Sequence, residues 1–278
     1  MMAWPLPGLQ RIALPRAAVF AQAGRGPVIL CIPGGYHSAF CFGPWLALLD
    51  RAGIAGAALE PRGKGSFAFL AESATGIAEY AEDAVQAARA LAQPVVLLGH
   101  SLGALVAMRA AEMLGDAAGL LLVAPSPPGN LPGAAPVPPV AEGAMLPPPD
   151  ISAIRARYFG DQDIADIAAY RAALSAESPR VLNDRYQLRI PIVRENLRGM
   201  PGLVIEAGRD DAARHPPGQD LAIAEFLGLD YQMLRDMPHC MMWQPWAEAS
   251  LAPIIAWHGV QFGAGALPQA KCGKQGTS

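Results

Sequence analysis

A serine between two glycines is the first feature of this sequence that could do chemistry. Residues 99–103 read Gly-His-Ser-Leu-Gly, which matches the pattern G-x-S-x-G with Ser101 at its centre. A serine hydroxyl is a poor nucleophile until a base takes its proton. By chance, roughly one in ten sequences with this glycine and serine content would contain such a match. The setting is more informative, because an apolar run precedes the motif and a helical pattern follows it.

That setting is the one a nucleophile elbow requires. A tight turn from strand to helix lifts the Ser101 hydroxyl clear of the sheet, and Gly99 and Gly103 leave room for neighbouring backbone. The N–H of Leu102 then points at the carbonyl oxygen under attack, and the helix N-terminus favours negative charge there. The competing interpretation is that Ser101 merely caps the helix, where serine is also favoured.

A second oxyanion donor is expected in the segment Pro-Gly-Gly-Tyr-His at 33–37, after another apolar run. Glycine lets the backbone approach a substrate oxygen without a side chain in the way. We expect the N–H of Gly35 to complete the oxyanion hole with that of Leu102, with Tyr36 as the alternative donor.

The base and its orienting acid are expected downstream, in the order acid and then histidine. Asp210 and Asp211 follow the apolar run 202–208, and His239 follows the last predicted strand. Since each lies after a strand's carboxyl end, all of them can meet Ser101 at one edge of the sheet. His239 would take the proton of Ser101, and one aspartate would fix the tautomer of the imidazole.

The remaining histidines and two arginines receive less reactive roles. His100 adjoins Ser101, but adjacent side chains at a tight turn point apart, so we expect it to pack or to hydrogen-bond. His215 and His258 are expected at the surface. Arg155 and Arg157 could clamp a substrate carboxylate, although a solvated helix face is the expected role. Candidate substrate contacts are Tyr36, His37, His100 and Met241, although packing is the expected role of His37 and of the group 240–246 that contains Met241. No clustered spacing of His, Cys and Asp predicts a metal site.

Short apolar runs alternate with helical patterns along most of the chain. The expected strands are a hairpin within 9–24 and the runs 27–33, 54–60, 94–99, 118–125, 202–208 and 229–234, eight in all. Helices are expected at 37–52, 76–92, 101–115, 216–227 and 243–257. This pattern predicts an α/β fold, in which helices cover a mostly parallel eight-stranded sheet.

Residues 125–200 break that alternation. Ten prolines lie between 125 and 149, where Glu142 is the only charged residue. Two helical patterns follow, with apolar positions at Ile151, Ile154 and Tyr158 and then at Ile164, Ile167 and Leu174. The low charge argues against a solvated linker, so we predict a cap over the carboxyl edge of the sheet. The core domain would then comprise 1–124 and 201–262, and 263–278 would be a disordered tail.

The composition narrows the class of protein. Of 278 residues, 52% are hydrophobic and 16% charged, and the formal net charge is −3. No basic bias favours nucleic acid or an anionic membrane. No apolar run approaches the ~18 residues of a membrane span, and the first residues do not resemble a signal peptide. The four cysteines form no CxxC pair. We predict a cytoplasmic protein with reduced thiols and a small-molecule substrate; the oligomeric state is left open.

Together these motifs resemble those of the α/β-hydrolase superfamily over roughly residues 9–260. Ile-Pro-Gly-Gly-Tyr-His-Ser-Ala-Phe-Cys-Phe-Gly-Pro-Trp is similar to the family's oxyanion loop in its "HGAWHGAWCW" form. Leu-Glu-Pro-Arg-Gly-Lys-Gly resembles its turn "DLRGHG", Gly-His-Ser-Leu-Gly-Ala its elbow, Ala-Gly-Arg-Asp-Asp its acid loop, and Met-Pro-His its histidine loop. The resemblance implies an eight-stranded sheet, a cap inserted after the sixth strand and no cofactor. Its G-x-x-D spacing, counted from Gly208, favours Asp211 as the acid, with Asp210 as the alternative.

The sequence also departs from the family pattern. Pro33 replaces the usual histidine of the oxyanion loop, and Glu60 and Lys64 replace the usual aspartate and histidine of the turn after the fourth strand. These positions are mainly structural in the family.

The leading hypothesis is a serine hydrolase that cleaves an ester-type bond of a small to medium, largely apolar substrate. The same scaffold would also suit a thioesterase, a carbon–carbon bond hydrolase, a hydroxynitrile-type lyase or a haloperoxidase, because fold does not decide function. A non-catalytic small-molecule receptor with an intact triad is the hypothesis from a different class.

Overall fold

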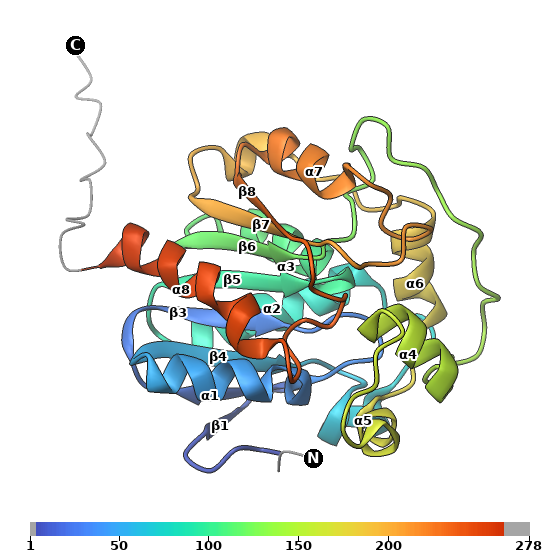
Figure 1. Cartoon of the computed structure of the whole chain (residues 1–278), viewed down its shortest axis with the longest axis horizontal. Helices are drawn as coiled ribbons and strands as arrows, with labels where there is room; N and C mark the ends of the chain where they lie inside the picture. Colours follow the sequence, from blue (N-terminus) through green and yellow to red (C-terminus); the bar gives the residue numbers. More distant parts are fainter. Residues whose placement is uncertain (1–3, 264–278) are drawn as a thin grey trace.

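A single eight-stranded sheet runs through the structure, a computed structural model that describes residues 4–263 (Figure 1). The strand order is β1-β2-β4-β3-β5-β6-β7-β8. The pairs β1–β2 and β2–β4 are antiparallel and the other five pairs are parallel. The predicted number and direction of strands are confirmed. Their bounds are β1 Gln10–Ala13, β2 Ala18–Gln22, β3 Arg25–Ile32, β4 Ile54–Glu60, β5 Val95–His100, β6 Gly119–Val123, β7 Gly202–Ala207 and β8 Asp230–Leu234.

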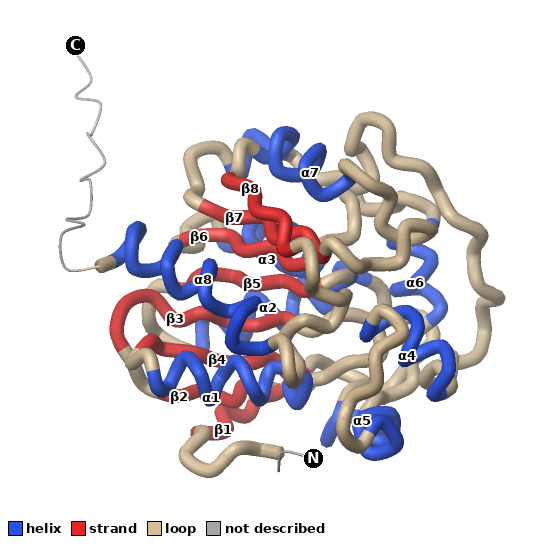
Figure 2. Tube along the Cα trace, viewed as in Figure 1, coloured by secondary structure: helices blue, strands red, loops and turns tan. Residues whose placement is uncertain are grey.

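Helices cover both faces of this sheet (Figure 2). Alternate residues of β3 face opposite cores, with Leu30 in one cluster of buried side chains and Cys31 in the other. Helices α2, α3 and α7 pack on the first face, and α1 and α8 on the second. Burial on both faces explains why the sequences of the central strands are continuous apolar runs. The bounds are α1 Gly43–Arg51, α2 Ile77–Ala90, α3 Leu102–Leu114, α7 Gln219–Leu227 and α8 Ala247–Phe262, with short 3₁₀ helices η1 Ala39–Phe42, η2 Gly65–Leu70 and η3 Arg194–Leu197.

The segment 125–200 lies at the carboxyl ends of the parallel strands, where Figure 1 shows its helices gathered beside the sheet. Helix α4 Ile151–Phe159 coincides with the first predicted helical pattern, and α5 Ile167–Ala173 with the middle of the second, whose Ile164 and Leu174 lie outside the helix. A third helix, α6 Pro179–Tyr186, was not predicted, although its start carries a recognisable signal. The Ser178 hydroxyl accepts a hydrogen bond from the Arg180 N–H, and Pro179 occupies the first turn.

The segment is tied to the core by buried side chains. Phe159 and Tyr170 join the cluster on one face of the sheet, and Val181 and Leu182 join the cluster on the other. This packing is not that of a solvated linker, which would leave such side chains in water.

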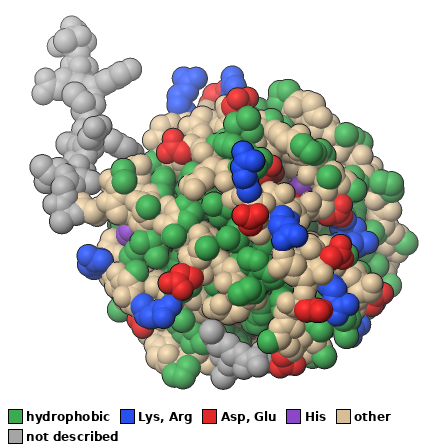
Figure 3. Space-filling view, in the orientation of Figure 1, with side chains coloured by type: hydrophobic (Ala, Val, Ile, Leu, Met, Phe, Trp, Pro, Cys, Tyr) green, Lys and Arg blue, Asp and Glu red, His purple; other side chains and the backbone are tan. Residues whose placement is uncertain are grey.

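Charged side chains are scattered over the face seen in Figure 3, with no single-sign patch on it. Within residues 4–263, no helix is long and apolar enough to cross a membrane. Cys31, Cys41 and Cys240 are buried free thiols. Cys272 and the predicted tail beyond Gly263 lie outside the described residues.

Candidate active site

Ser101 occupies a strained turn between β5 and α3. Its backbone has φ 55° and ψ −123°, a conformation that costs energy for a residue with a side chain. The turn has no room for a side chain at Gly103, because a Cβ there would lie 2.5 Å from the carbonyl oxygens of Ile32 and Pro33. Ser101 stands at the N-cap position of α3, yet its hydroxyl makes no capping hydrogen bond. The geometry therefore fits an elbow better than a cap.

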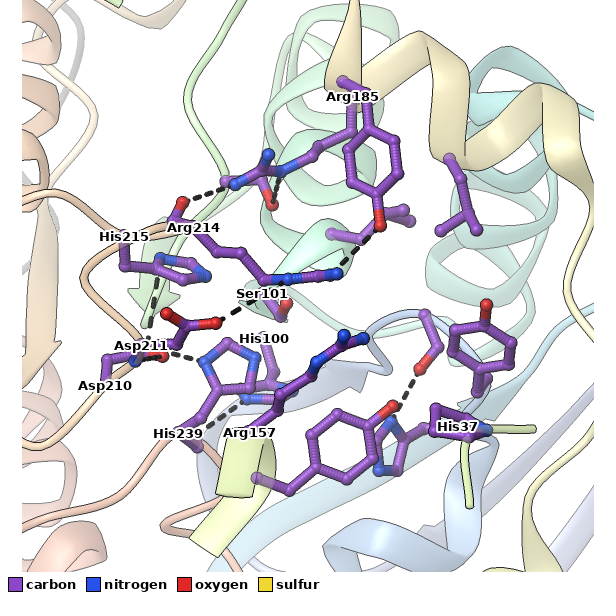
Figure 4. Close-up of a pocket in the computed structure, with 18 residues that line it drawn as sticks. His37, His100, Ser101, Arg157, Arg185, Asp210, Asp211, Arg214, His215 and His239 are labelled. Carbon is purple, nitrogen blue, oxygen red and sulfur yellow. Dashed lines mark hydrogen bonds and ion pairs between the residues drawn. The ribbon is translucent and has the colours of Figure 1, made fainter. Parts of the chain in front are cut away.

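His239 makes a short hydrogen bond to Asp210. The distance from His239 Nδ1 to Asp210 Oδ2 is 2.6 Å, and both side chains are less than 10% exposed. A carboxylate can only accept, so Nδ1 donates and Nε2 is left as a proton acceptor. In Figure 4 the His239 ring is seen between Asp210 and Ser101, and all three line one cavity.

This contact corrects the preference for Asp211 that the spacing had favoured. The Asp210 N–H bonds to the Ala207 carbonyl at 3.1 Å, and this turn directs the Asp210 side chain towards His239. Asp211 begins the next turn instead: its Oδ1 accepts from the Ala213 N–H at 3.0 Å, and its Oδ2 lies 3.8 Å from Arg214 Nε.

The acid is held ionised. Burial raises the pKa of the Asp210 carboxyl, but the contacts with His239, the nearby His215 and the Asp211 N–H together lower it, and the pKa falls below its usual value. A carboxylate with such a pKa stays negative at neutral pH and can stabilise an imidazolium.

Two of the three predicted oxyanion donors lie beside Ser101. Gly35 and Leu102 both line the cavity. Gly34 packs so closely that a Cβ there would lie 3.0 Å from Ser101 Cβ. The third candidate donor is already engaged, since the Tyr36 N–H donates to Glu177 Oε2 at 2.7 Å. Tyr36 is therefore corrected from a donor to a wall of the cavity, and the expected pair is Gly35 and Leu102.

A buried ion pair supports the loop at 33–37. Lys64 Nζ lies 2.7 Å from Glu177 Oε1, and the two side chains are 1% and 0% exposed. Glu177 also accepts from Tyr80 Oη at 3.0 Å and from the Tyr36 N–H. The lysine that departs from the family pattern thus fixes the glutamate that holds the loop.

Lys64→Met is expected to lower the free energy of unfolding by about 3–5 kcal/mol, because it leaves the Glu177 carboxylate buried without its cation. Urea unfolding measures this loss. Arg16→Met provides the matched control: Arg16 pairs with Glu72 at 3.1 Å on the surface, where such a pair contributes about 0–1 kcal/mol. Equal, small losses in the two variants would contradict a structural role for the buried pair.

His37 and His100 make hydrogen bonds within the wall of the cavity. His37 Nδ1 donates to the Gly35 carbonyl at 2.8 Å, and its Nε2 accepts from Tyr170 Oη at 2.7 Å. His100 Nε2 donates to the His239 carbonyl at 2.9 Å. Burial lowers the pKa of His37 to about 3 and that of His100 well below its usual value, so both rings are neutral. Both also line the cavity, as expected of substrate contacts.

Three expectations about single residues are wrong. Met241 is fully buried in the core and does not line the cavity. His258 is 4% exposed and hydrogen-bonds the Pro27 carbonyl rather than facing solvent. His215 lies in the cavity, with its ring centre 4.9 Å from that of His239 and Nδ1 3.8 Å from Asp210 Oδ2.

The position of His215 creates a group that sequence spacing did not predict. Ligand atoms of Asp210, His215 and His239 all lie within 4.8 Å of one another, close enough to share one metal ion. Two of the three are the hydrogen-bonded acid and base. A metal held there would occupy the atoms that proton transfer needs.

Comparison with known proteins places the chain in a family. Residues 29–250 match the model of the alpha/beta hydrolase family. The chain therefore belongs to the alpha/beta hydrolase family, and the expected fold and enzyme class, a hydrolase, are confirmed. No curated protein matches it by sequence.

Solved structures agree on the fold at low identity. A methylesterase from Arabidopsis has a TM-score of 0.63 and 18% identity, covering 84% of this chain and 100% of that one. A carboxyl esterase from Bacillus coagulans has a TM-score of 0.64 and 15% identity, covering 91% and 98%. An N-acyl homoserine lactonase complexed with N-butanoyl homoserine has a TM-score of 0.65 and 16% identity, covering 90% and 97%.

Proposed function

We propose that this chain is a serine hydrolase of ester-type bonds, with Ser101 as nucleophile, His239 as base and Asp210 as the orienting acid. One observation carries the proposal: the Asp210–His239 hydrogen bond opens onto the cavity in which the strained Ser101 lies. Structural neighbours named as a methylesterase, a carboxyl esterase and a lactonase support the ester class.

The reaction would proceed in two steps. His239 Nε2 takes the Ser101 proton while Oγ attacks the acyl carbon, and the Gly35 and Leu102 N–H groups stabilise the oxyanion. The imidazolium protonates the leaving alcohol as the C–O bond breaks. Water, deprotonated by His239, then adds to the acyl-enzyme and releases the acid and Ser101.

We also propose residues 125–200 as a cap on this site. Tyr158 from α4 and Leu182 from α6 line the cavity together with the core residues. Residues 125–200 therefore help to exclude water from the substrate site and to shape it.

A fluorophosphonate probe tests the nucleophile directly. We expect stoichiometric labelling of the folded protein, with the mass of the adduct found on the peptide that contains Ser101. Ser126 offers an internal comparison, because it lines the same cavity without an acid–base pair.

Failure of labelling would decide against the enzyme. If Ser101 stays unmodified and a broad panel of esters and thioesters is not turned over, the hypothesis of a serine hydrolase fails and that of a small-molecule receptor is favoured. Turnover of a hydroxynitrile without an acyl-enzyme would instead indicate a lyase.

A further inference from the structure

Three arginines from separate segments converge on the cavity of Ser101. Arg157 comes from α4, Arg185 from α6 and Arg214 from the loop after β7, and all three line the cavity. Figure 4 shows the guanidinium groups of Arg157 and Arg214 extending into the hollow beside Ser101. Residues 125–200 supply two of these cations, Arg157 and Arg185. The three positive charges therefore come together only because this segment packs on the core.

Arg185 is the most unusual of the three, because it is buried without a carboxylate partner. It is 8% exposed, and within residues 4–263 no carboxylate oxygen lies in ion-pair distance of its guanidinium. Its Nε donates to Ser126 Oγ at 3.3 Å and its Nη2 to the Arg214 carbonyl at 2.6 Å. Neither neutral acceptor cancels the charge, and a buried unpaired charge is costly.

The two acidic side chains that line the cavity, Asp210 and Asp211, do not neutralise its three arginines. Asp210 is engaged by His239, and Asp211 makes a long contact of 3.8 Å with Arg214, in which both side chains are about a third exposed. Arg157 makes no ion pair among the described residues and is exposed at the rim. The cavity therefore carries one more positive than negative charge, although the whole chain has a formal net charge of −3.

The excess charge lies close to the reacting group. Ser126, which accepts from Arg185, donates its own N–H to the Ser101 carbonyl at 3.1 Å. Arg214 Nη1 donates to Tyr186 Oη at 3.1 Å, which holds its guanidinium against the wall that α6 contributes. The arginines that would bind an anion therefore line the same cavity as the Ser101 hydroxyl that would attack the acyl carbon.

We propose that the substrate is an ester that carries one carboxylate a few bonds from the scissile bond, and that Arg185, Arg214 and Arg157 bind that carboxylate. The inference rests on the proposed hydrolase function and replaces the largely apolar substrate expected from the sequence. A guanidinium matches the planar carboxylate with paired N–H donors. A single excess positive charge matches one carboxylate better than a doubly charged phosphate.

Paired chromogenic esters test this proposal. The probes are the mono-4-nitrophenyl ester of glutaric acid, which keeps one free carboxylate, and 4-nitrophenyl pentanoate, which has the same acyl length and no charge. We expect kcat/KM to be at least about tenfold higher for the anionic ester, with a preference that weakens as salt is added. We expect Arg185→Met to reduce that preference by about 10- to 100-fold, the effect of losing a hydrogen bond to a charged group.

Two further variants separate recognition from folding. Arg157→Met removes an exposed rim cation, so the protein should fold while the preference falls. Arg155→Met is the matched control on the same helix: Arg155 pairs with Asp163 at 2.8 Å and does not line the cavity, so the preference should be unchanged.

The outcomes distinguish this inference from the function on which it rests. If both esters are hydrolysed equally well and the arginine variants leave their ratio unchanged, the carboxylate is rejected while the hydrolase stands. If neither ester is turned over and Ser101 resists the fluorophosphonate, the hydrolase fails and the inference fails with it. A preference for a phosphate-bearing ester of similar length would likewise overturn the carboxylate.

Discussion

Ser101→Ala is expected to reduce kcat for ester hydrolysis by about 10⁴- to 10⁶-fold, as loss of the nucleophile does in enzymes that use a Ser-His-Asp triad. The variant keeps the oxyanion donors Gly35 and Leu102, so a small residual rate above that in water should remain. Release of 4-nitrophenolate from a chromogenic ester measures the loss. Wild-type protein should also show a burst equal to the enzyme concentration, which the variant lacks.

Ser126→Ala is the control for this result. Ser126 lies in the same cavity and is buried, yet its hydroxyl contacts Arg185 rather than His239. It should keep the burst and the fluorophosphonate label. If Ser101→Ala keeps the burst and Ser126→Ala loses it, the elbow has been assigned to the wrong serine.

The core of the fold was predictable because its signals are local. The run 94–99 and the helical pattern at 101–115 coincide closely with β5 and α3, since strands buried on both faces must be apolar throughout. Helix α6 was missed because its eight residues Pro179–Tyr186 are mostly polar and bury Asn183, Asp184 and Arg185 as well as its apolar side chains. Periodicity of apolar residues cannot detect a helix whose buried face is polar.

The site was predictable only where a motif fixes the backbone. The elbow and the histidine loop lie next to strand ends, and their residues therefore reach the cavity. The choice between Asp210 and Asp211 depended on the direction of two adjacent side chains in one turn. The positions of His215 and Arg185 depended on how distant segments pack. Neither kind of information is contained in spacing along the chain.

The strain at Ser101 links the fold to the proposed chemistry. Its positive φ is held by hydrogen bonds from the Ser101 N–H to the Val123 carbonyl at 2.9 Å and from the Ala104 N–H to the Ser101 carbonyl at 3.0 Å. Contacts with β6 and with α3 thus maintain a conformation that an isolated turn would avoid. As a result, the Ser101 hydroxyl faces the cavity instead of capping α3.

Asp210→Asn is expected to reduce kcat by about 10³- to 10⁴-fold with little change in KM, as the corresponding change does in other triads. An asparagine can donate its NH₂ to His239 Nδ1, which favours the tautomer with a proton on Nε2. In that tautomer His239 cannot accept the proton of Ser101. The charge that stabilises the imidazolium is lost as well. Steady-state kinetics on a chromogenic ester measure both kcat and KM.

Asp211→Asn distinguishes the two neighbouring acids, because it makes the same chemical change one residue further along. Asp211 bonds to the Ala213 N–H and lies near Arg214, and His239 contacts Asp210 instead. Its loss should change kcat by no more than a few fold for a neutral ester. A large loss in Asp211→Asn, with Asp210→Asn nearly as active as wild type, would mean that the spacing from Gly208 identifies the acid better than the hydrogen bond does. The turn from Ala207 to Asp211 would then have to rearrange in the working enzyme, since one conformation cannot direct both carboxylates at His239.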